Sequence, residues 1–156
     1  MYKRQVVTNA LNIAAILGDV PGNAVPKPGC QFKAPTLSLS GDKSVEYFRN
    51  VFAWKLILAT AGVAPDTGLT CPSFADLQQK EAMIKAASHV CLVADSTKID
   101  RSCFTRLGSM DVIQSFITDR GITDRGITDH GITDDGIADT DTREFERCGF
   151  EVRIAP

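Results

Sequence analysis

Apolar residues along the chain follow two alternating periods, one typical of strands and the other of helices. The run "HVCLVA" (89–94) is continuously apolar, as expected of a strand buried on both faces, and "KLILAT" (55–60) has the same character. Between these runs lies a helical pattern in which Leu77, Ile84 and Ala87 share one face. Strands alternating with helices predict an α/β fold with a parallel-rich sheet and helices on both of its faces.

Shorter signals predict the other elements. Ser73, with Asp76 three residues later, forms a capping-box start for the helix between the two strands. Asn9 and Asp42 are candidate N-caps of two earlier helices, the first expected at 10–17. The remaining predictions are strands at 5–8, 115–117 and 150–154, a loop at 61–72, one face of the second helix made of Val45, Phe48 and Phe52, and a helix at 142–148 that Gly149 ends.

Length, charge and cysteine content limit the functions that this fold can serve. The 156 residues, 44% of them hydrophobic, suit one globular domain with a buried core. Lys and Arg number 17 against 19 Asp and Glu, so there is no basic field to attract nucleic acid or an anionic membrane. The five cysteines form no Cys-x-x-Cys pair, which favours reduced thiols and a cytoplasmic location. No metal-binding spacing or cofactor motif is present, and no apolar run approaches the ~20 residues of a membrane span.

Polar residues follow several predicted strands at the edge where parallel sheets bind ligands. They are Thr8 and Asn9, Thr60 to Gly62 in "ATAG", Asp95 to Lys98 in "DSTK", and Thr118 with Asp119. Their hydroxyls, carboxylates and single lysine predict a small polar ligand that is anionic, and the first helix could present free N–H groups to a phosphate. Turn formation and helix capping explain each residue equally well when it is taken alone.

Taken in order, these segments resemble the effector-sensing C-terminal domain of the DeoR family of bacterial sugar-metabolism repressors. The resemblance is carried by "VVTNALNIAAIL", "PKPGC", "SGDKSVEYFRN", "AGVAPDTGLT", "KEAMIKAASHVCLVADSTK" and "FITD". It runs from about Val6 to Asp119 and resumes from Thr140 to Ala155. It implies a sheet similar to that of ribose-5-phosphate isomerase, a phosphorylated sugar or polyol as effector, and assembly into a homo-oligomer.

The resemblance also implies an effector site. Lys98 would give a point charge to a phosphate or sugar oxygen, and Asp95 would bind sugar hydroxyls or steady the lysine. Without the resemblance, the same two residues suit an exposed ion pair in a surface turn, worth ~0 to 1 kcal/mol. The residues of the expected site are Thr8, Asn9, Gly29, Gly62, Gly68, Lys80, Asp95 and Lys98.

Two features of the family do not occur in this sequence. They are the winged helix-turn-helix that binds DNA and the glycine-threonine loop that holds the phosphate. We therefore expect a partial sensing domain at 6–156, without its first strand, behind a non-family leader at 1–5. DNA binding is expected only through a missing N-terminal domain.

The related isomerase fold supplies an alternative function, an enzyme that acts on sugar phosphates. Isomerisation needs a carboxylate base, but Lys80 stands where the catalytic glutamate would be. The acidic loop of the isomerase falls on "ATAGVA", which contains no acid, and Glu81 would face another side of its helix. Binding without turnover is the favoured interpretation. An assembly module whose open sheet edge pairs with another chain is the second alternative.

A tandem repeat, "ITDRGITDRGITDHGITDDG", occupies residues 117–136. Its glycine at every fifth position opposes a helix, and isoleucine at the same period forms no apolar stripe on a helix or a strand. We interpret 117–139 as an expanded loop of the sensing domain. The alternative is an acidic array in which Asp119, Asp124, Asp129 and Asp134 bind a cation weakly.

Overall fold

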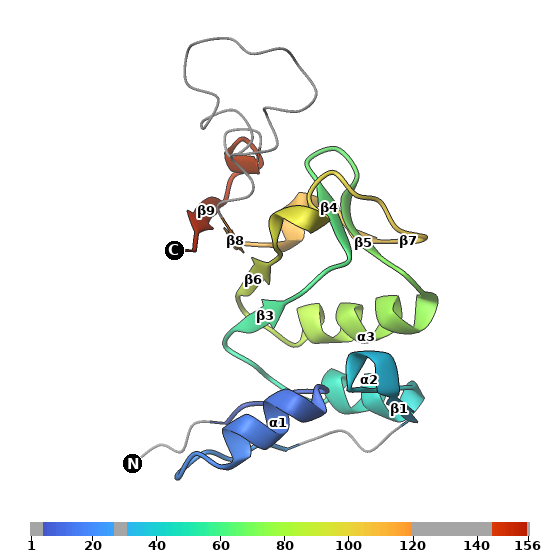
Figure 1. Ribbon diagram of the computed structural model, residues 1–156, viewed down its shortest axis with the longest axis vertical. Coiled ribbons are helices and arrows are strands. Elements are labelled where there is room, and N and C mark those ends of the chain that lie inside the picture. The colour runs from blue at the N-terminus through green and yellow to red at the C-terminus, as the bar shows by residue number, and fades with distance from the viewer. Residues whose placement is uncertain (1–4, 27–30, 120–144, 156) are drawn as a thin grey trace. The chain divides into compact units, whose positions relative to one another are not determined.

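The structure of the chain is a computed structural model that describes residues 5–26, 31–119 and 145–155 (Figure 1). It forms two compact units, residues 1–52 and 53–156. No helix within the described ranges is long and apolar enough to cross a membrane. Gly29, a predicted site residue, and residues 120–139 of the predicted expanded loop lie outside the described residues.

The first unit contains two helices and a two-stranded sheet. Its elements are α1 (Leu11–Gly18), β1 (Gln31–Lys33), β2 (Ser38–Ser40) and α2 (Asp42–Arg49). β1 pairs with β2 in antiparallel fashion, and α2 lies against β2. Val45 and Phe48 are buried, which confirms that they share the apolar face of α2. Phe52 lies beyond the helix and is 92% exposed, so its place on that face was predicted wrongly.

Two predictions for the first residues of this unit, a strand at 5–8 and an N-cap at Asn9, are also wrong. Residues 5–8 form no strand, because Gln5 makes only an isolated bridge to Ala24. The N-cap of α1 is Ala10, and the Asn9 side chain instead meets a partner elsewhere in the unit. A cap preference is a local signal, and a hydrogen bond to a distant backbone group replaces it here.

The cap of α2 also differs from the prediction by one residue. Gly41 is the N-cap, at φ 110°, and Asp42 is the first residue of the helix. The Asp42 carboxylate still lies in the first turn, where the helix dipole favours a negative charge. Likewise, the first helix was expected at 10–17, and α1 begins and ends one residue later, at Leu11 and Gly18.

The second unit is built around a parallel four-stranded sheet. Its strands are β3 (Leu56–Leu58), β6 (Val90–Val93), β8 (Ser115–Thr118) and β9 (Glu151–Ile154), in the order β3-β6-β8-β9. Leu58, Leu92 and Phe116 lie in register across three of these strands, and all three are buried. The predicted α/β fold with a parallel sheet flanked by helices is confirmed.

Helix α3 (Phe74–Lys85) follows the predicted capping box. The Asp76 backbone N–H donates to Ser73 Oγ at 3.3 Å, and the Ser73 hydroxyl donates to Asp76 Oδ2 at 2.7 Å. Leu77 and Ile84 pack against the core, as their shared face predicts. The capping box and the apolar face therefore place α3 as the sequence indicates.

A three-stranded antiparallel sheet replaces the loop that was predicted at 61–72. β4 (Gly62–Ala64) and β5 (Gly68–Cys71) form a hairpin, and β7 (Thr105–Gly108) extends it to the order β4-β5-β7. The glycine and proline content favoured a loop, but all seven residues of β4 and β5 are buried. Burial and strand pairing thus override local propensity in this segment.

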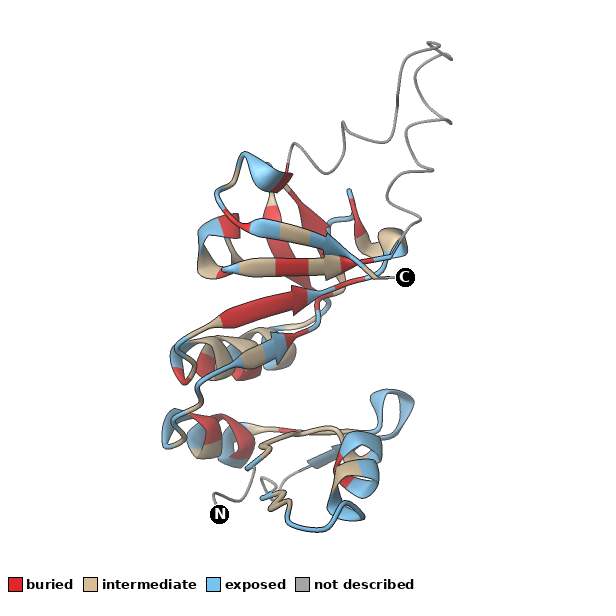
Figure 2. Cartoon of the chain, turned by 90° about the vertical axis from the view of Figure 1, so that its left-hand side faces the viewer, coloured by how far each residue is buried: buried red, intermediate tan, exposed pale blue. Residues whose placement is uncertain are grey.

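The buried apolar residues of the second unit form a single core cluster. Figure 2 colours the buried residues red. The cluster includes residues of both sheets, such as Leu69 and Leu92, together with Ile99 from the segment that follows β6. Phe145 and Glu146 are helical, and Phe145 also belongs to this core. The core residues with the largest fully buried side chains are Leu58, Val63, Leu69, Cys71, Leu92, Ile99, Phe116 and Phe145.

Candidate binding site at the carboxyl edge of the parallel sheet

The ends of two neighbouring strands bring polar residues together at the carboxyl edge of the parallel sheet. β6 is followed by a 3₁₀ turn, Ser96–Lys98, and β8 is followed by Asp119. The backbone N–H of Ala94 donates to the Ile117 carbonyl at 3.1 Å and extends the pairing of the two strands to their ends. This pairing places the turn beside Asp119.

Asp95 caps the turn and is held as a carboxylate. Its Oδ1 accepts hydrogen bonds from both the backbone N–H of Thr97, at 2.9 Å, and the Thr97 hydroxyl. The hydrogen bond from the Thr97 side chain is the main reason that the pKa of Asp95 is lower than usual, and the charge of Lys98 acts in the same direction. Asp95 is therefore an ionised acceptor close to a cation.

Lys98 is the last residue of the turn, and its side chain is partly exposed. Its backbone N–H donates to the Asp95 carbonyl at 2.9 Å, which closes the turn. The bonded turn fixes the backbone from which the Lys98 side chain extends, and its ammonium is a point charge at the sheet edge that an anionic group could use. Asp95 and Lys98 are the two predicted site residues that the structure brings together here.

Thr118 and Asp119 complete this edge, although the expected site did not include them. Thr118 is 3% exposed, and its hydroxyl oxygen has no hydrogen-bond partner in the described part of the chain. Asp119 Oδ1 accepts a hydrogen bond of 3.1 Å from the backbone N–H of Ser96. In the sequence, only their position directly after a predicted strand pointed to this edge. That position does not distinguish a ligand-binding residue from one that only forms a turn.

Comparison with known proteins assigns the chain to a family. Residues 2–120 match the family model described as the DeoR C terminal sensor domain. The chain belongs to the DeoR C-terminal sensor domain family. The match includes both segments of the sheet edge, the Ser96–Lys98 turn and Asp119.

Curated relatives of this DeoR sensor domain are transcriptional regulators. It is 32% identical over 113 residues to the HTH-type transcriptional regulator GlpR of Haloferax volcanii, covering 72% of this chain and 44% of that protein. It is 27% identical over 115 residues to the HTH-type transcriptional repressor GlcR of Bacillus subtilis, covering 74% and 44%. Identity to the glycerol-3-phosphate regulon repressor of Escherichia coli is 26% over 118 residues, covering 74% and 46%. The chain thus spans less than half the length of these relatives.

Two predicted site glycines of the DeoR sensor domain, Gly62 and Gly68, allow close backbone packing in the hairpin. A Cβ on Gly62 would lie 2.2 Å from the Arg101 carbonyl oxygen, and one on Gly68 would lie 2.2 Å from that of Gly108. Gly68 also has φ +77°, a conformation that side chains disfavour. The hairpin itself thus explains both glycines, with no ligand needed.

Lys80, the residue aligned with the isomerase glutamate, lies against a thiol in the DeoR sensor domain. Its ammonium is close enough to the Cys71 thiol, at the end of β5, for the positive charge to favour the thiolate. Burial raises the pKa of the Cys71 thiol and outweighs the opposite effect of the Lys80 charge. The described contacts of Lys80 therefore connect α3 to the three-stranded sheet.

Thr8 and Asn9 belong to the first unit of the DeoR sensor domain, where both have local hydrogen bonds. Thr8 Oγ1 accepts from the backbone N–H of Ala10 at 3.1 Å. The Asn9 side-chain amide donates to the Leu39 carbonyl at 3.3 Å. These contacts hold the start of α1, and Gly29, the remaining predicted site residue, is outside the described ranges.

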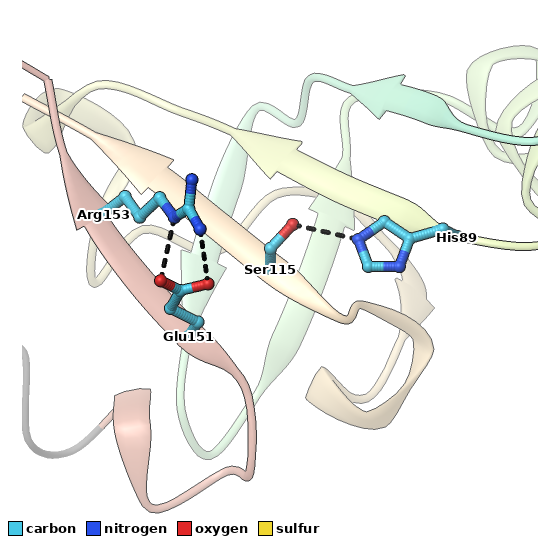
Figure 3. Close-up of polar contacts among 4 residues, drawn as sticks. All are labelled: His89, Ser115, Glu151 and Arg153. Atoms are coloured by element: carbon cyan, nitrogen blue, oxygen red, sulfur yellow. Dashed lines mark hydrogen bonds and ion pairs between the residues drawn. The ribbon is translucent and has the colours of Figure 1, made fainter.

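The parallel sheet carries a second polar group on its face (Figure 3). His89 Nε2 lies 3.4 Å from Ser115 Oγ, and the Arg153 guanidinium donates two hydrogen bonds of 2.9 Å to Glu151. Within the described ranges no carboxylate contacts His89, so the third group that would orient a catalytic histidine is missing. Across all residues that the structure describes, no three His, Cys, Asp or Glu side chains lie close enough together to hold a metal ion.

Proposed function

We propose that the chain is the effector-sensing part of a DeoR-type repressor of carbohydrate metabolism, and that it binds a phosphorylated sugar or polyol. The observation that carries the proposal is the Ser96–Lys98 turn, which presents Lys98 beside an ionised Asp95 at the carboxyl edge of the parallel sheet. Such edges are where open α/β sheets bind ligands. Membership of the sensor-domain family supports a sensing role.

The two side chains suit the two ends of a phosphorylated polyol. The Lys98 ammonium can donate a charge-assisted hydrogen bond to a phosphate oxygen. The Asp95 carboxylate can accept from a hydroxyl group of the same ligand, because the pKa of Asp95 is lowered and the group stays ionised. A neutral sugar would satisfy only the second contact, so affinity is expected to depend on the phosphate.

The relatives supply a first set of probes. One of them is named as a repressor of a glycerol-3-phosphate regulon, which makes glycerol 3-phosphate a natural member of the panel. Hexose and pentose phosphates extend the panel to larger polyols. The proposal names the chemical class of the effector and leaves its size to the measurement.

We propose that the site binds its effector without turning it over. Isomerisation needs a base that moves a proton between neighbouring carbons. Lys80, an ammonium group near the Cys71 thiol, stands in place of the base, and residues 59–64, which form β4 and the chain before it, contain no carboxylate. The relatives, named as regulators and repressors, are consistent with binding alone.

The remaining partners are proposed for the whole regulator. Contact with DNA is proposed to be made by another part of a longer protein, because a net charge of −2 does not favour a polyanion. We also propose that the sensing domain assembles with copies of itself and acts in the cytoplasm. Four of the cysteines are free thiols, in keeping with a reducing compartment.

Thermal denaturation with a ligand panel tests the proposal. A ligand that binds only the folded chain stabilises it by RT ln(1 + [L]/Kd), ~2.7 kcal/mol at a hundredfold excess over Kd. At least one of glycerol 3-phosphate, glucose 6-phosphate and ribose 5-phosphate should raise the midpoint. Glycerol, glucose and ribose, used as matched controls, should not. No shift with any phosphate at millimolar concentration would contradict the proposal.

A further inference from the structure

We propose that Asp119 is a positioning residue for Lys98 and fixes the turn that presents the lysine to the effector. This inference rests on the proposed function. It assigns a role to a residue that the expected site did not contain. The geometry behind it is the hydrogen bond of 3.1 Å from the backbone N–H of Ser96 to Asp119 Oδ1.

The turn has two carboxylates, one at each of its first two backbone N–H groups. Asp95 Oδ1 accepts from the N–H of Thr97, and Asp119 Oδ1 accepts from the N–H of Ser96. The first N–H groups of a helical turn have no partner inside the turn, so outside acceptors determine how well it is ordered. Asp95 is the N-cap of the turn itself, whereas Asp119 directly follows the neighbouring strand β8.

The bond to Asp119 therefore anchors the turn to the sheet. Ser96 and Asp119 are 23 residues apart in sequence, and the strands that precede them, β6 and β8, are paired in parallel. Lys98 lies two residues after Ser96 and closes the same turn through its own N–H. When Ser96 loses its hydrogen bond to Asp119, the turn is held only by its connection to β6 and by Asp95. A less ordered turn gives a less localised ammonium and a weaker phosphate contact.

Charge alone leads to the opposite expectation for Asp119. A carboxylate close to a phosphate repels it, so an Asp119 that acted only through its charge would weaken effector binding. Any substitution that removed the charge would then improve affinity. A positioning role depends instead on the acceptor oxygen, which asparagine retains and alanine does not.

The experiment compares Asp119→Asn, Asp119→Ala and Asp111→Ala with the unaltered chain. Asp111 is an exposed carboxylate of the same unit, away from the turn in sequence, and controls for the loss of one charge. Each protein is titrated calorimetrically with glycerol 3-phosphate, glucose 6-phosphate and ribose 5-phosphate. Hydrogen exchange at the Ser96 and Thr97 amides is measured without ligand, so that order in the turn is observed independently of binding.

Asp119→Ala should weaken phosphate binding about tenfold and speed Ser96 exchange by a similar factor, as expected for one lost hydrogen bond. Asp119→Asn and Asp111→Ala should stay within about twofold of the unaltered chain in both measurements. Equal affinity for Asp119→Ala and the unaltered chain, or improved affinity for both Asp119 variants, would overturn the positioning role and leave the proposed function intact. If the unaltered chain binds none of the phosphates, the proposed function fails, and the role of Asp119 in binding fails with it.

Discussion

Phe116 and Phe145 pack edge to face in the core of the second unit, with ring centroids 5.2 Å apart and ring planes at 61°. Phe116 is a central residue of β8, and Phe145 follows the segment that contains the tandem repeat. This pair therefore ties the chain on the far side of the repeat to the parallel sheet. Aromatic pairs of this geometry add to the large apolar area that each ring buries.

Phe145→Ala is expected to lower the free energy of unfolding by ~3 to 5 kcal/mol, because a large side chain is deleted from a packed core. Phe145 is only 2% exposed, whereas Phe104, 78% exposed, provides a matched control. Phe104→Ala should change stability by less than about 1 kcal/mol. Urea denaturation of both variants is the measurement. Equal losses in the two variants would show that the Phe116–Phe145 contact does not stabilise the fold.

Thr118→Val is expected to stabilise the chain by ~1 kcal/mol, because it removes a buried hydroxyl that has no partner among the described residues and keeps the shape of the side chain. Thr105→Val is the matched control. The Thr105 hydroxyl donates to the Cys71 carbonyl at 3.0 Å, so its loss should destabilise by ~1 to 3 kcal/mol. Chemical denaturation compares the two. Destabilisation by Thr118→Val would show that its hydroxyl has a partner in solution.

The turn at the sheet edge should open in acid. The pKa of Asp95 is lowered chiefly by the Thr97 side chain, so the bonds to Asp95 stabilise the turn above the usual carboxyl pKa. That stability is lost as the pH falls through the lowered value. Thr97→Val removes the hydroxyl donor and should move the pKa of Asp95 upward. A carbon-detected NMR titration of the Asp95 carboxyl group measures its pKa in the unaltered chain and in the Thr97→Val variant. Identical pKa values in the two proteins would refute the role of the Thr97 hydroxyl.

The sequence alone predicted helices and strands correctly where the signals lie in neighbouring residues. The Ser73–Asp76 capping box and the apolar run 89–94 predicted α3 and β6, because caps and continuous burial leave a pattern in neighbouring residues. The hairpin of β4 and β5 was missed because its glycines and proline indicate a loop. Only the close packing against residues such as Arg101 explains why glycine is needed at Gly62.

The candidate site was predictable in part for the same reason. The position of Asp95 and Lys98 directly after an evident strand placed them at the sheet edge. The contact of Asp119 with Ser96 depends on strand pairing across 23 residues, which local patterns do not reveal. Lys80 was assigned by alignment with an isomerase helix, and its contact with Cys71 became apparent only from the packing of α3.

Deletion of Gly121 to Asp135, which joins Arg120 to Gly136, tests the interpretation of the repeat as added loop length. The deletion should leave phosphate affinity unchanged and raise the free energy of unfolding by ~1 kcal/mol, because a closed loop about threefold shorter costs less entropy. Denaturation of both chains with and without calcium is the measurement. A shortened chain that unfolds more easily or loses its ligand would show that the array has a role of its own.

The most direct test of the account is the affinity of the Lys98→Ala variant for the phosphates, measured by isothermal titration calorimetry. Lys85→Ala is the matched control, since Lys85 is an exposed lysine at the last position of α3. Lys98→Ala should weaken the binding of glycerol 3-phosphate, glucose 6-phosphate or ribose 5-phosphate by ~1.5 to 3 kcal/mol, the range for a hydrogen bond to a charged group. Lys85→Ala should bind as the unaltered chain does. Equal affinities for all three proteins would contradict the assignment of the site to the Ser96–Lys98 turn.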